Sequence, residues 1–288
     1  MIDLQPTILA IKRLIDDGSA ASLTYAALEC RLAIERICYE RLRLAHEYIS
    51  HADLRRWQPK DVVQTLIAEV DESAASTYTW AISADPPKSG LPEPTKEDYE
   101  SMEFHTIGTQ VGFDPKKLGR LWYALAKLAL HVSLPESKDD FVNQYGDAKE
   151  IKAKVSEAIT EIERISHGTL IASGMVNPET ISFSCYCGAT TKRRVGLLRD
   201  SQKVSCIIPE CPETFQYDLS GSRFTRRTFN VVCAECQTES RIPLKKFELL
   251  STNERLSFDC EKCNKKIYIG WYLQVSQEIN SESEDKTD

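Results

Sequence analysis

The distribution of cysteine constrains this chain more than any other feature of its sequence. Eight of its ten cysteines fall between positions 185 and 263, in four close pairs with the spacings CxC, Cx4C, CxxC and CxxC. A tight turn that carries two cysteines can present both sulfurs to one ion, and two such turns complete a tetrahedral four-thiolate cage. The second half, CxxC–x23–CxxC, has a regular spacing, and the irregular first half gains weight because it stands directly before it.

We therefore predict two structural Zn²⁺ sites with four thiolates each, formed from consecutive pairs. The first set is Cys185, Cys187, Cys206 and Cys211, and the second is Cys233, Cys236, Cys260 and Cys263. An interleaved pairing and a metal-free, reduced set are the alternatives. Disulfides are disfavoured because the N-terminus does not resemble a signal peptide and cytosolic thiols stay reduced. A closed four-thiolate site leaves no open position on the metal, so it stabilises a fold and does no chemistry.

Length and composition indicate an intracellular protein of more than one domain. At 288 residues with 42% hydrophobic content, the chain can build two cores. It contains no apolar run long enough to cross a bilayer. The N-terminal stretch is amphipathic and carries acids, so it predicts a first helix rather than a targeting segment. We expect a cytoplasmic protein with no membrane partner.

The charge balance argues against a strongly basic nucleic-acid binder. Residues 181–276 hold 15 basic and 10 acidic side chains, although the whole chain carries −7. Eight thiolates and two Zn²⁺ ions would reduce that local excess to about +1. Proteins that bind nucleic acid nonspecifically are usually far more basic.

Hydrophobic periodicity predicts an α+β multidomain protein, with an N-terminal α-helical bundle followed by a small β-rich tandem zinc-ribbon domain. Apolar residues recur at helical spacing up to about residue 166, and short alternating runs follow from Ile181. Cys30 and Cys38 fall on the apolar stripe of the second helix, which predicts core positions for both. The predicted divisions are a bundle at 1–168, a linker at 169–180, ribbons at 181–228 and 229–276, and a disordered acidic tail at 277–288.

Two stretches of the helical part resemble HEPN-type domains of bacterial toxin and phage-defence proteins. They are Leu32–Glu35 (LAIE) and Leu118–His131 (LGRLWYALAKLALH). The resemblance covers roughly residues 20–166. It implies a helical domain that dimerises, and in active members a metal-independent ribonuclease with an Arg-x4-His motif at a cleft shared by two protomers. A bacterial defence or toxin system is the context that the resemblance implies.

The residues depart from that catalytic motif. His131 is present, but the position five before it is Ala126, and the nearby cation is Lys127, which cannot bind a phosphate in the bidentate way of arginine. A literal Arg-x4-His does occur at Arg41 and His46, on the second helix. Five helical residues turn through about 140° beyond one full turn, so these two side chains do not share a face. The sequence contains no phosphate-binding loop, HExxH or GxSxG motif.

A group of basic residues in the cysteine-rich region is a candidate binding patch. Its members are Lys192, Arg193, Arg194, Arg223, Arg226 and Arg227. Basic side chains near the aromatic residues Phe224 and Phe229 could bind phosphates and stack bases, or could contact an acidic protein. We predict a noncatalytic binding or regulatory protein that contacts nucleic acid or a protein partner, and that forms a homodimer through its helical domain. The alternative is a ribonuclease that uses His131 or His46.

Overall fold

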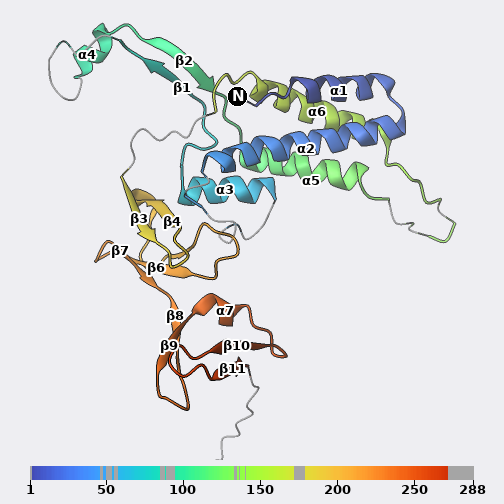
Figure 1. The fold of residues 1–288 in the computed structure, drawn as a ribbon. Helices are drawn as coiled ribbons and strands as arrows, with labels where there is room; N and C mark the ends of the chain where they lie inside the picture. The colour runs from blue at the N-terminus through green and yellow to red at the C-terminus, as the bar shows by residue number, and fades with distance from the viewer. Residues whose placement is uncertain are drawn as a thin grey trace, which may run out of the picture. The chain divides into compact units, whose positions relative to one another are not determined.

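The structure is a computed structural model, and it is mixed α+β (Figure 1). It describes residues 2–45, 48–49, 54, 58–84, 88, 95–132, 135, 137–139, 141–171 and 179–271. Two compact units are present, Met1–Asp200 with Cys206–Pro209 and Ser201–Ser205 with Glu210–Asp288. Among the described residues, no helix has the length and apolar character needed to cross a membrane.

The first unit begins with a bundle of helices arranged around α2. The bundle helices are α1 (Gln5–Asp17), α2 (Ala20–Leu44), α3 (Pro59–Glu69), α5 (Pro115–Ala129) and α6 (Ala148–Ser166). The helix α2 contacts all four of the others (Figure 1). Cys30 and Cys38 lie on its buried face, which confirms them as core residues. The helix ends at Leu44.

Local sequence signals determine where these helices begin and end. Ser19, Asp114 and Asp147 each precede a helix and accept a hydrogen bond from a backbone N–H of its first turn. Gly18 ends α1 in a left-handed conformation (φ 67°), which glycine adopts without strain. Each of these signals is local, so it acts through residues that are close together in the chain.

A two-stranded antiparallel ribbon interrupts the bundle. Its strands are β1 (Tyr78–Ile82) and β2 (His105–Gln110), and the short helix α4 (Lys96–Ser101) lies between them in the chain. Thr95 and Asp98 form a capping box at the start of α4. The residues of β1 alternate as in a typical strand, whereas the polar run His-Thr-Ile-Gly-Thr-Gln of β2 has no clear alternation.

The cysteine-rich region is built from short antiparallel strands. They are β3 (Thr180–Ser184) and β4 (Thr190–Arg194) in the first unit, then β5 (Lys203–Ser205), β6 (Thr214–Asp218), β7 (Arg223–Arg226), β8 (Thr228–Val232), β9 (Glu239–Pro243), β10 (Arg255–Asp259) and β11 (Lys266–Gly270). The strands β5, β6 and β7 form one sheet, while β3–β4, β8–β9 and β10–β11 are hairpins. A 3₁₀ turn, η1 (Val195–Leu197), follows β4, and the helix α7 (Leu244–Glu248) follows β9.

Clusters of buried apolar side chains are confined to the helical part of the described chain. The larger cluster runs from Leu4 to Ile165, and the smaller one from Ala45 to Ala74. An isolated two-stranded hairpin is at best marginally stable in water, and small domains without a large core need a metal or disulfides. The hairpins therefore depend on other interactions, and the cysteines are the residues placed to supply them.

Candidate metal centres

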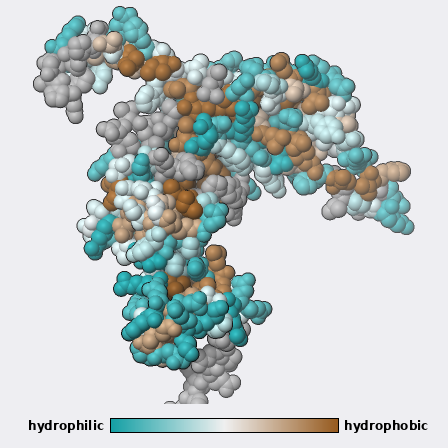
Figure 2. Space-filling model, viewed as in Figure 1, coloured by the Kyte–Doolittle hydropathy of each residue, from teal (hydrophilic) through white to brown (hydrophobic). Residues whose placement is uncertain are grey.

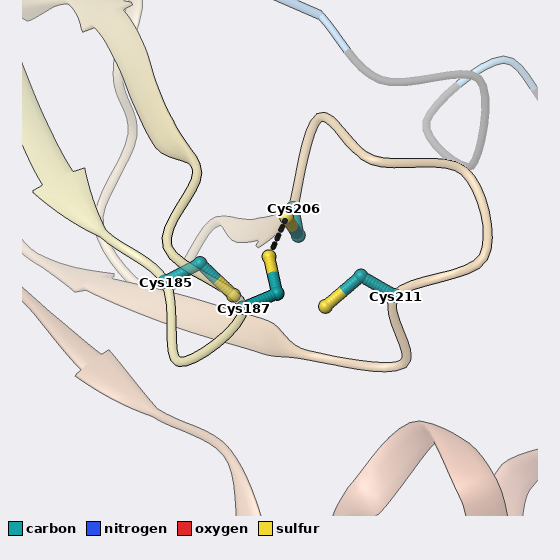
Figure 3. Close-up of side chains that lie close together, drawn as sticks. All are labelled: Cys185, Cys187, Cys206 and Cys211. Atoms are coloured by element: carbon teal, nitrogen blue, oxygen red, sulfur yellow. Dashed lines mark hydrogen bonds between the residues drawn. The ribbon is translucent and has the colours of Figure 1, made fainter.

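The first group of four cysteines is carried by a tight turn and a longer loop. Cys185 and Cys187 lie in the turn between β3 and β4, where Gly188 (φ 90°) donates its N–H to the Cys185 carbonyl. Cys206 directly follows β5, and Cys211 lies in the loop before β6. Figure 3 shows the four side chains pointing toward one another. The four Sγ atoms all lie within 4.8 Å of one another.

The second group is formed by two turns of the same design. In the β8–β9 turn, Cys233 N–H donates to the Thr238 carbonyl at 2.9 Å, and the β10–β11 turn repeats this bond from Cys260 N–H to the Lys265 carbonyl at 2.9 Å. In each turn, the residue four after the first cysteine is left-handed, with φ 57° in one and 56° in the other. The repeat brings two CxxC turns together, with all four Sγ atoms within 4.8 Å of one another.

The sulfur separations fit a tetrahedral metal cage. Sγ–Sγ distances are 3.6 Å for Cys187–Cys206, 3.6 Å for Cys233–Cys263 and 3.5 Å for Cys236–Cys260. Four thiolates at about 2.3 Å from a central Zn²⁺ would lie about 3.8 Å apart. A disulfide would require about 2.05 Å. Consecutive pairs meet, as in the sequential arrangement, and the described cysteines do not show the interleaved one.

The surroundings shift the pKa values of the thiols in different directions. Hydrogen bonds with the side chain and backbone of Thr238 lower the pKa of the Cys236 thiol to about 6. Burial raises the pKa of Cys206 instead, although the Ile208 N–H donates to its sulfur at 3.5 Å. A metal ion would displace protons from such a group, because only the thiolate is a ligand. By contrast, burial raises the pKa of Cys30 and Cys38 to about 12, as expected for unreactive core thiols.

The basic run on β4 is not an exposed patch. Arg193 is only 1% exposed, and Arg194 pairs with Asp71 at 3.8 Å in the same unit. Lys192 is half-buried and lies opposite Ser182 in the β3–β4 register. The partner Asp71 lies more than a hundred residues away in the chain, so no local pattern could have identified it.

The three arginines around β7 are also paired with acids of their own unit. Arg226 binds Glu213 in a bidentate pair, with its Nε 2.7 Å from Oε2. Arg227 lies 3.2 Å from Glu248. Arg223, the most exposed of the three, lies 3.3 Å from Asp218. Most of the predicted patch therefore neutralises internal carboxylates.

Of the catalytic candidates, Arg41 is buried and makes structural hydrogen bonds. Arg41 is 5% exposed, and its guanidinium donates to the Gln110 side chain and, at 3.4 Å, to the Val111 carbonyl. Lys127 and His131 are both exposed, in the last turn of α5 and just beyond its end. His46 lies outside the described residues.

Comparisons of the chain with family models, with curated proteins and with solved structures find no match. The two four-cysteine groups therefore carry the functional argument.

Proposed function

We propose that this chain is a noncatalytic binding or regulatory protein, whose cysteine-rich region is held by two structural Zn²⁺ ions and contacts another protein. The observation that carries the proposal is the pair of closed four-cysteine groups. Four thiolates fill a tetrahedral coordination shell, so a metal held in this way has no position left for water or substrate. The metal would then maintain a surface for recognition.

Zinc is the proposed ion because of the ligand set. Four thiolates in tetrahedral positions select Zn²⁺ or an iron–sulfur centre among the common biological metals. Elemental analysis of the purified full-length chain should give two zinc per chain and no stoichiometric iron. Iron in place of zinc, or clearly fewer than two metals per chain, would contradict this assignment.

A protein partner is favoured over nucleic acid by the internal pairing of the arginines. Arg194, Arg226 and Arg227 each have a carboxylate partner and low side-chain exposure. Releasing them to bind phosphates would leave those carboxylates unpaired. We expect no retention of labelled single-stranded RNA, tRNA or duplex DNA at physiological salt. Retention that is weakened by Arg223→Ala would instead support a nucleic-acid binder.

A gel that follows the retention of labelled RNA also shows whether the RNA is cleaved, so it tests the ribonuclease alternative. RNA incubated with the wild-type chain should remain intact, since Arg41 is committed to the fold and Lys127 lacks the geometry of a guanidinium. Cleavage that is lost in His131→Ala or His46→Ala would overturn the noncatalytic proposal and would identify the histidine.

Self-association through the helical bundle belongs to the same proposal. It is supported by the resemblance to HEPN-type domains and by an apolar row on α2 formed by Tyr25, Leu28 and Leu32, which are 59%, 37% and 48% exposed. Their spacing places them on one face of the helix. Light scattering of the full-length chain should give a dimer, and Leu28→Glu with Leu32→Glu should give a monomer that retains two zinc.

A further inference from the structure

An apolar groove lies in the second unit beside α7. It has a volume of about 370 Å³, and its walls come from strands β8 and β11, from α7 and from the residues that follow them. The apolar lining is formed by Phe229, Leu244, Phe247, Leu250, Ile269 and Trp271. Figure 2 shows apolar side chains gathered over α7, while the surrounding surface of the hairpins is mostly hydrophilic. None of these residues belongs to the four-cysteine groups.

Internal contacts hold the aromatic walls in place. The rings of Phe229 and Phe247 pack with their centroids 4.9 Å apart. The indole N–H of Trp271 donates to the Phe247 carbonyl at 3.3 Å, so the polar group of the tryptophan is already satisfied. Phe229 and Trp271 nevertheless remain 50% and 54% exposed. Ordered aromatic rings with exposed faces are typical of the anchor pockets of protein interfaces.

The rim of the groove carries more basic than acidic side chains. Glu248, the one acid among its described lining residues, pairs with Arg227 at 3.2 Å and with Lys203 at 3.7 Å. Two further cations adjoin lining residues. Lys245 follows Leu244 on α7, and the Cγ of Arg255 lies beside Gly270, 3.6 Å from the position that a Cβ there would take. Within the described residues, the side chains of Lys245 and Arg255 make no ion pair or hydrogen bond.

We propose that this groove docks a large apolar side chain from an acidic segment of a partner protein. This inference rests on the proposed binding function and specifies its partner. The lining provides a desolvated site for a leucine or an aromatic ring, and the cationic rim attracts flanking carboxylates. Nucleic-acid bases also stack on exposed rings, but a single strand needs a longer basic track for its phosphates, and Arg226 and Arg227 are already paired with Glu213 and Glu248.

The test is binding of a defined probe to the full-length, zinc-loaded chain. The probe is a fluorescein-labelled twelve-residue peptide in which a Leu-Trp pair is flanked on both sides by glutamates. Fluorescence anisotropy should show saturable binding that weakens as salt is raised. A peptide with Ser-Ser in place of Leu-Trp, and one with lysines in place of the glutamates, should each bind at least about tenfold more weakly.

Variants of the chain locate the binding to the groove. Trp271→Ala and Phe229→Ala should each weaken peptide binding about tenfold or more. Lys245→Glu should weaken it less and should flatten the salt dependence. Tyr268→Ala is the matched control, because Tyr268 is a similarly exposed aromatic residue on β11, at 63%, but points to the face opposite Ile269. All variants should retain two zinc per chain, which verifies that they are folded.

Several results would overturn the inference. Equal binding of the Ser-Ser peptide would indicate simple charge attraction, and wild-type affinity in Trp271→Ala would place the peptide elsewhere. If substituting Tyr272→Ser with Leu273→Ser tightened peptide binding tenfold or more, the groove would be occupied by the chain's own C-terminal segment. Displacement of the peptide by poly-uridine RNA would indicate base stacking. If the chain binds two zinc and leaves RNA intact but does not bind the peptide, the docking proposal is wrong, while the proposed noncatalytic function with two structural zinc ions still holds.

Discussion

At the residue scale, Arg41 connects α2 to the end of β2 through hydrogen bonds. Its guanidinium bonds to Gln110 and Val111 and lies 5.9 Å from the centre of the Phe113 ring. Burial lowers the pKa of Arg41 from its usual value, and the hydrogen bonds replace part of the hydration that the buried guanidinium loses. We expect Arg41→Ala to lower the free energy of unfolding by about 2–4 kcal/mol, since it leaves buried acceptors unpaired.

The matched control for this change is Arg43→Ala, two residues further along the same helix. Arg43 is exposed and, among the described residues, pairs with Glu40 alone, so we expect a loss of no more than about 0.5 kcal/mol. Urea denaturation followed by circular dichroism would measure both. If Arg41→Ala were as stable as the wild type, the guanidinium would not have the structural role assigned to it here, and a catalytic role would regain support.

Glu161 gives the bundle a pH dependence. Hydrogen bonds from Arg164 and Lys117, at 2.6 Å and 2.8 Å, lower the pKa of this buried carboxyl. Because the folded pKa is below the unfolded value of about 4.3, the stabilisation is fully present above that pH and is lost as pH falls through the folded pKa. Glu161→Gln should cost about 1–3 kcal/mol at pH 7, a difference that shrinks toward zero in acid.

The control for that series is Glu157→Gln, one turn earlier on α6, where the carboxylate is exposed and pairs with Lys154. It should change the unfolding free energy by less than about 0.5 kcal/mol at every pH. Urea titrations from pH 7 down to acid would record the two curves. A Glu161→Gln penalty that stayed constant below pH 4 would contradict the assigned ion pair.

The burial of some single residues can be predicted from the sequence, and that of others cannot. The positions of Cys30 and Cys38 in the core were predictable because apolar periodicity is local. Arg193 and Arg194 were predicted to lie on the surface, because a Lys-Arg-Arg run gives no local sign that its side chains are buried. Their burial depends on residues such as Asp71 that only the tertiary fold brings near. The same holds for the groove, whose walls come from three separate elements.

At the scale of elements, helices were more predictable than strands. Helix caps such as Asp114 and Asp147 are short sequence signals, so a helix start can be located from a few neighbouring residues. The strand β4 has no such signal, because its sequence, Thr-Thr-Lys-Arg-Arg, does not alternate and its order comes from pairing with β3. The cysteine turns were predictable because their signal is local: two cysteines a few residues apart can bind one metal ion only from a tight turn.

The hairpins β8–β9 and β10–β11 should depend on their shared four-cysteine group. Cys260→Ser removes one of four ligands, so metal analysis should fall from two zinc to one per chain. Both hairpins should then become sensitive to protease, because neither has a buried apolar cluster of its own among the described residues. Cys30→Ser, in the core of α2, should retain two zinc. Two zinc in the Cys260→Ser variant would exclude Cys260 as a ligand.

At the scale of the whole molecule, two sources of stability operate in different parts of the chain. The helices up to residue 166 bury a continuous apolar core, which requires no ion. The short strands of residues 179–271 bring eight cysteines into two groups and show no comparable apolar cluster among the described residues. Binding free energy for a structural metal is folding free energy when the site does not exist in the unfolded chain. Removing metal should therefore affect the two parts unequally.

Chelation tests this division directly. After treatment with a strong zinc chelator under reducing conditions, the helical circular dichroism signal and its thermal transition should persist, while residues 179–271 become rapidly cleaved by protease. Eight thiols should become reactive, and the two thiols of α2 should stay protected by burial. Restoring zinc should reverse each change. Loss of the helical transition together with the metal would mean that the bundle depends on the cysteine groups. The helical core would then not be stable independently of the metal sites, contrary to the prediction.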